Sequence, residues 1–135
     1  MTRNVKQFLS GLLAFIFLIS FSAWSNDRVL QQAYESKRSD IQVQGSGKVS
    51  RILPDDNKGS RHQRFILRLG TRQTILIAHN IDLAPRISNL RVGDVVKFNG
   101  EYEWNKLGGV IHWTHKDPRN NHPHGWLKHK GKQYD

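Results

Sequence analysis

The chain has 135 residues, and its 21 lysines and arginines outnumber its 11 acidic residues, which gives a net charge of +10 with neutral histidines. It contains no cysteine, so a disulfide framework and a lipid anchor on an N-terminal cysteine are both excluded. This length predicts one domain, and the basic excess favours a polyanionic partner.

The first 25 residues have the order of a secretory signal peptide. Two basic residues precede an apolar run over 8–21, and Ala23 and Ser25 are the small residues before a cut between Ser25 and Asn26. An uncleaved anchor is the alternative, but a spanning helix needs about 20 apolar residues. We therefore expect a periplasmic or secreted protein with no membrane span, keeping 19 basic and 11 acidic residues and a net charge of +8.

Residues 26–44 predict a polar arm or one short helix, because a few apolar side chains recur there at roughly helical spacing. Strand-like segments separated by turns then extend over 45–117. The segment 118–135, with two prolines and few apolar residues, predicts an irregular tail packed on the domain. The expected strands lie at 47–54, 61–69, 73–79, 96–104 and 110–115.

Alternation of apolar and polar residues within these strands identifies an expected core. The third strand is apolar on both faces and is expected to be central. Five strands, with a longer connector between the third and the fourth, predict an all-β fold in the form of an OB-like barrel, and an SH3-like barrel is the alternative. The expected core residues are Val49, Phe65, Leu67, Ile75, Ile77, Val96, Phe98, Ile111 and Trp113.

Several segments of the chain also carry a resemblance to a known family. They read RILPDD, HQRFILRL, LIAHNIDLAPRI, GEYEWN, GGVIHWTHKDP and GWLKHKGKQY. Together they resemble a bacterial family of short exported proteins that is filed as a domain of unknown function. The resemblance covers about residues 45–135 and implies export and a single domain, and it implies no substrate, cofactor or catalytic residue.

A basic row is expected on the outer face of the second strand. Because the apolar residues of that strand turn inward, His62, Arg64 and Arg68 must face outward. OB domains bind oligonucleotides and oligosaccharides on this part of the barrel, and aromatic side chains beside basic groups hold single strands. The first hypothesis is therefore binding of a polyanion, most concretely single-stranded nucleic acid, by Arg51, His62, Arg64, Arg68, Lys97 and Trp126.

A small secreted phosphodiesterase or nuclease is the second hypothesis. His79 and Asp82 follow a buried strand, where they could act as a base and its orienting carboxylate, with His62 beside them and Arg64 stabilising negative charge. No Walker loop or glycine-rich dinucleotide turn is present, which excludes common nucleotide-dependent enzymes. An envelope interaction protein without catalysis is the third hypothesis.

Histidines near the end of the expected fifth strand raise the question of a metal ion, the one cofactor that the sequence suggests. His112, His115 and Asp117 are residue types that bind zinc, and the hydrolase hypothesis would include them. A spacing of three, however, places two side chains on opposite faces of a strand. A shared ion would therefore need a bulge or a strand end near Thr114.

Overall fold

The computed structural model describes residues 26–135, and the expected signal peptide lies outside the described residues. Residues 26–35 are helical. No helix in this described part of the chain is long and apolar enough to cross a membrane. The rest is mainly β, as predicted, with β1 (Ile41–Asp56), β2 (His62–Arg68), β3 (Thr74–Asn80), β4 (Val95–Glu103), β5 (Val110–His112), β6 (Trp126–His129) and β7 (Lys132–Tyr134).

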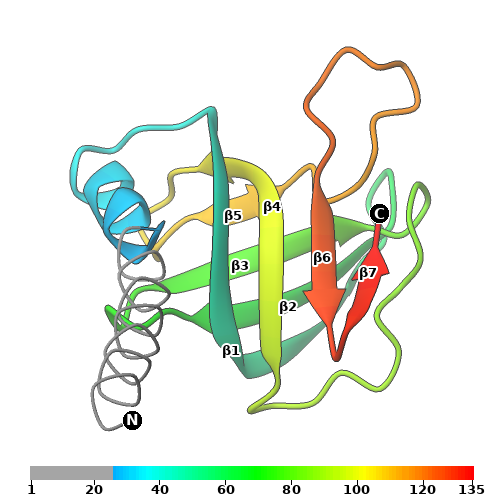
Figure 1. Ribbon diagram of the computed structural model, residues 1–135, viewed down its shortest axis with the longest axis horizontal. Coiled ribbons are helices and arrows are strands. Elements are labelled where there is room, and N and C mark those ends of the chain that lie inside the picture. Colours follow the sequence, from blue (N-terminus) through cyan, green and yellow to red (C-terminus); the bar gives the residue numbers. More distant parts are fainter. Residues whose placement is uncertain (1–25) are drawn as a thin grey trace, which may run out of the picture.

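Five of these strands form a closed ring. β1 pairs with β2, β2 with β3, β3 with β5, β5 with β4, and β4 pairs again with β1. Only the β3–β5 pair among these five is parallel. β6 continues the sheet beyond β4, and β7 pairs with β6, so that β1, β4, β6 and β7 lie side by side in front of β2 and β3 (Figure 1).

The core fills the ring, and eight of the nine expected core residues are buried. Trp113 is the exception, and its prediction was wrong. β5 ends at His112, and Trp113 has a positive φ of 55°, which no strand residue adopts. The strand therefore ends three residues earlier than expected. Thr114 and His115 take buried positions instead, and Trp113 is only half-buried.

β1 is longer than expected, because residues 41–44 are its beginning and do not belong to a polar arm. Its first half pairs with β4 and its second half with β2, so the strand must bend between two neighbours. Gly45 lies within the first half, opposite Phe98, where a Cβ atom would stand 2.5 Å from Cζ of Phe98. The missing side chain lets β1 pass over the core ring of Phe98.

Part of the C-terminal segment forms strands, which corrects the prediction of an irregular tail over 118–135. A loop over 113–125 leads to a hairpin of β6 and β7, and the buried side chains of Leu127 and Tyr134 attach this hairpin to the core. Its two-residue turn consists of Lys130 and Gly131, which both have positive φ, as a type I′ turn requires.

The helical residues and the β3–β4 connector cover the two ends of the ring. Leu30 and Ala33 of the helix are buried, and the indole Nε1 of Trp104 donates a hydrogen bond to the carbonyl oxygen of Tyr34. The connector forms turns and no helix, and it inserts the buried side chain of Ile87. Apolar side chains from the helix and the connector therefore cover the core, and the protein has no disulfide.

Candidate functional site

The outer surface of β1, β4 and β6 gathers several exposed cations. Strand register places Lys97 of β4 opposite Lys128 of β6, and Asn99 opposite Trp126. Side chains that face each other across antiparallel strands have Cβ atoms about 4.5–5.5 Å apart. β1 lies on the other side of β4, and register places Lys48 of β1 opposite Arg68 of β2. We call this surface the basic face and define it as Lys48, Arg68, Lys97, Trp126 and Lys128.

The cations of the basic face are not neutralised by neighbouring acids. Within residues 26–135, the ion pairs involve Arg61, Arg86, Lys116 and several histidines, and none involves a cation of this face. The ammonium Nζ of Lys128 lies 4.2 Å from the ring centroid of Trp126. At this distance the ammonium group is attracted to the indole ring, so the positive charge of Lys128 is held beside Trp126.

A shallow hollow of about 320 Å³ lies at the Arg68 end of the basic face. Ser46, Lys48, Arg68 and Val95 contribute to its lining, so a hydroxyl, an ammonium and a guanidinium group surround one space. At the other end, Nε2 of Gln42 donates a 2.8 Å hydrogen bond to Oδ1 of Asn99, next to Trp126. The face therefore combines charge, amide groups and an aromatic ring.

The structure brings together only part of the predicted ligand-binding set. Arg68, Lys97 and Trp126 belong to the basic face, whereas His62 and Arg64 lie toward the opposite end of β2. Nε of Arg64 donates a hydrogen bond to the carbonyl oxygen of Pro54, and its side chain lines a hollow with two aspartates. Arg51 is exposed on β1 opposite Ile66.

The predicted base and orienting carboxylate are not joined. His79 is fully buried, and its Nε2 donates a 2.9 Å hydrogen bond to the carbonyl oxygen of Pro85, while Nδ1 accepts one from Oγ1 of Thr114 at 2.7 Å. Burial lowers the pKa of His79 to about 4, so the imidazole is neutral. The carboxylate of Asp82 accepts instead from Arg61, which corrects the prediction of a catalytic pair.

The predicted metal ligands are also separated by their own hydrogen bonds. Both carboxylate oxygens of Asp117 accept backbone N–H groups, from Arg119, Asn121 and His122, and the first of these is the largest cause that lowers the pKa of Asp117. Nδ1 of His115 donates to the carbonyl oxygen of Lys116. Across residues 26–135, no three His, Asp or Glu side chains are arranged to hold a metal ion.

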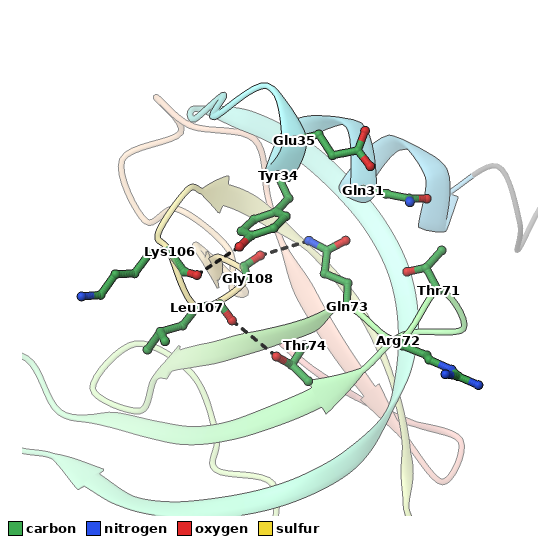
Figure 2. Close-up of a pocket in the computed structure, with 10 residues that line it drawn as sticks. All are labelled: Gln31, Tyr34, Glu35, Thr71, Arg72, Gln73, Thr74, Lys106, Leu107 and Gly108. Carbon is green, nitrogen blue, oxygen red and sulfur yellow. Dashed lines mark hydrogen bonds between the residues drawn. The ribbon is translucent and has the colours of Figure 1, made fainter.

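A second depression of about 430 Å³ lies where the helix meets the ring (Figure 2). Hydrogen bonds across it join the hydroxyl of Tyr34 to the carbonyl oxygen of Lys106, and Nε2 of Gln73 to that of Gly108. Tyr34 and Gln73, two of the side chains that line it, are therefore bonded to the backbone. Gln73 also donates a hydrogen bond to the carbonyl oxygen of Leu30. The depression is therefore a contact region between the helix, the start of β3 and the β4–β5 turn.

Sequence reasoning missed Lys48 and Lys128 of the basic face. The sequence carries a signal for both residues. Lys48 precedes the buried Val49, and Lys128 follows the buried Leu127, so each lies on the outer side of its strand. It also missed Glu101 and His122, whose side chains lie 3.6 Å apart although 21 positions separate them in the chain. No local pattern in the sequence could reveal that contact.

The comparisons with known proteins agree with the segments noted in the sequence. No curated protein matches the chain. The family model described as "Protein of unknown function (DUF3465)" matches residues 12–135, which is most of the chain. The protein therefore belongs to this family of unknown function.

Proposed function

We propose that the protein binds single-stranded nucleic acid along the basic face, and that the ring of five strands is an OB-like barrel. The observation that carries the proposal is a set of four cations without acidic partners, aligned across β2, β1, β4 and β6 beside one half-buried indole. OB-fold proteins that bind single strands combine a positive groove with aromatic side chains in this way.

Each type of side chain on the face has a separate role in this proposal. Lys48, Arg68, Lys97 and Lys128 would contact phosphates and release counterions, which supplies affinity without sequence preference. Trp126 would stack on a base, because every base has an aromatic surface. The surplus of 19 basic over 11 acidic residues beyond position 25 would attract the ligand at longer range.

We also propose that the protein works in the periplasm or outside the cell, after cleavage between Ser25 and Asn26. The support for this is the N-terminal sequence, which has a basic start, an apolar run and small residues before the cut. The mass of the protein purified from the periplasmic fraction tests it, because the mature chain would begin at Asn26.

Replacing Lys97 and Lys128 together by glutamine is expected to weaken binding to an oligo(dT) strand and to flatten its salt dependence. Each phosphate contact on a single strand contributes about 0.7 to the slope of log affinity against log salt, so two lost contacts lower the slope by roughly 1.4. Fluorescence anisotropy at several salt concentrations measures this. The double variant Arg72→Gln, Lys106→Gln removes equal charge beside the helix (Figure 2) and is the control. Equal slopes for both double variants would contradict the assignment of this face.

Replacing Trp126 by leucine is expected to cost about 1–3 kcal/mol of binding free energy, because one base loses its stacking partner. The salt slope should stay close to that of the parent, since no charge is removed. Leucine preserves apolar contact with the sheet, and a circular dichroism melt checks the fold. A variant with parental affinity would remove stacking from the proposal and leave only charge.

A further inference from the structure

We propose that Glu101, His112 and His122 form a proton-dependent switch that strengthens nucleic-acid binding to the basic face at acidic pH. This inference rests on the proposed function, whose ligand would lie directly beside the switch. It concerns residues outside the basic face as defined above, and it explains a cluster of charged groups that the binding proposal does not use.

The outer face of β4 places negative charge next to the basic face. Buried residues alternate along β4, so Lys97, Asn99, Glu101 and Glu103 follow one another on its outer side. Residues two apart on a strand are separated by about 7 Å, so the Glu101 carboxylate lies close to the Asn99 and Trp126 pair. An ionised Glu101 would therefore repel a phosphate bound beside Trp126.

Two imidazoles face the Glu101 carboxylate from different elements. Nε2 of His112, on β5, lies 3.3 Å from Oε2 of Glu101 and 3.5 Å from Oε1 of Glu103. Nε2 of His122, in the loop over 113–125, lies 3.6 Å from the same Oε2 of Glu101. One carboxylate oxygen thus lies within ion-pair distance of two histidines, each of which can carry a positive charge.

The hydrogen bonds of His122 determine what its protonation does. Nδ1 lies 2.9 Å from the carbonyl oxygen of Pro123, which can only accept, so Nδ1 carries a proton in every state of this contact. In the neutral ring, Nε2 then presents a lone pair to the Glu101 carboxylate. Only the charged ring places a proton between them. The contact between His122 and Glu101 is therefore attractive when His122 is protonated and repulsive when it is not.

The surroundings of the two histidines support a response to protons. Nε2 of His112 is buried without a hydrogen-bond partner, although two carboxylates stand near it. The ring of His122 stacks on Trp113 with centroids 4.0 Å apart, and its backbone N–H is bonded to Asp117. Gln42 of β1, opposite Glu101, is uncharged. The groups that face the histidines are therefore mainly acidic.

Protonation would change the charge beside the basic face. Histidine side chains change charge between about pH 5 and pH 8. At the acidic end of this range, the imidazolium groups neutralise Glu101 and Glu103. At the alkaline end, the carboxylates remain uncompensated beside the ligand. Binding is therefore expected to be tighter at acidic pH.

The test measures oligo(dT) affinity by fluorescence anisotropy at constant salt, at about pH 7.5 and at about pH 5.5. The parent protein is expected to bind about tenfold more tightly at the lower pH. Glu101→Gln removes the repelling charge, so it should bind tightly at both values. The double variant His112→Gln, His122→Gln should bind weakly at both, and its circular dichroism spectrum reports whether it is folded.

A control variant separates this switch from the general effect of charging histidines. His124 lies in the same loop, is exposed and bonds to Oδ1 of Asn120, so His124→Gln should keep the full pH response of the parent. Equal affinity of the parent at both pH values would overturn the switch and leave the binding proposal intact. A parent with no affinity at either pH would overturn the binding proposal and the switch with it. Should the double variant fail to fold, a pH response of Glu101→Gln equal to that of the parent still refutes the switch.

Discussion

Replacing Phe65 by alanine is expected to lower the free energy of unfolding by about 3–5 kcal/mol, as is typical of a buried phenylalanine. The Phe65 side chain is fully buried, and it belongs to a core that one small domain must hold together without disulfides. A loss of this size is a large part of the usual stability of such a domain, about 5–15 kcal/mol. Urea unfolding followed by tryptophan fluorescence measures it.

The matched control for Phe65 is Ile52, which lies opposite it on β1 and is 46% exposed. Because nearly half of Ile52 stays exposed to water, Ile52→Ala should cost less than about 1 kcal/mol. Similar losses for the two variants would mean that the inward face of β2 has been assigned incorrectly.

Acid is expected to destabilise the protein through His79. The pKa of this buried imidazole is lowered to about 4, first by desolvation, from an ordinary value of 6.5. Between these two values the unfolded chain binds a proton that the folded chain does not, so unfolding becomes more favourable as the pH falls. Above about pH 6.5, His79 is neutral in both the folded and the unfolded chain, and its full contribution to the free energy of unfolding is present. Up to about 3 kcal/mol of this free energy is lost as the pH falls to about 4.

Urea unfolding of the parent and of His79→Gln over this pH range measures the contribution. The parent should lose stability more steeply than the variant, which has no group to protonate at this position. His124→Gln, altered at an exposed histidine, should follow the parent. Asp94 and Asp117 have lowered pKa values, so their stabilising effect is lost only at more acidic pH and does not produce this difference. Parallel curves for the parent and His79→Gln would contradict the buried, neutral state of His79.

The central strands could be predicted because their signals are local. In β2, apolar residues such as Phe65 and Leu67 alternate mostly with polar ones, so the sequence alone shows both the strand and its inward face. In β3, an uninterrupted apolar run that includes Ile77 marks a buried strand. The short β6 and β7 strands could not be identified in the same way. β6 is fixed by its pairing with β4, which is distant in the sequence, and β7 by its pairing with β6 through the turn at Lys130 and Gly131.

The candidate site was predicted less completely than the core, for a related reason. Alternation assigns a side chain to a face of its own strand, and Arg64 and Arg68 do both lie on the outer side of β2. It does not give the register of the neighbouring strand. That register places Arg68 beside Lys48, whereas Arg64 lines a hollow with Asp55 and Asp56. Two residues with the same pattern thus have different electrostatic environments.

The pairing that closes the ring has a consequence for folding kinetics. Ile41 pairs with Tyr102, 61 positions away, and every β1–β4 contact joins similarly distant segments. A contact of this kind forms only after a long loop has lost much of its conformational entropy. All-β domains that depend on such contacts fold in about milliseconds to seconds, whereas helical bundles need only microseconds to milliseconds. The hairpin of β2 and β3 can form early, and the first half of β1 keeps an unpaired edge until β4 arrives.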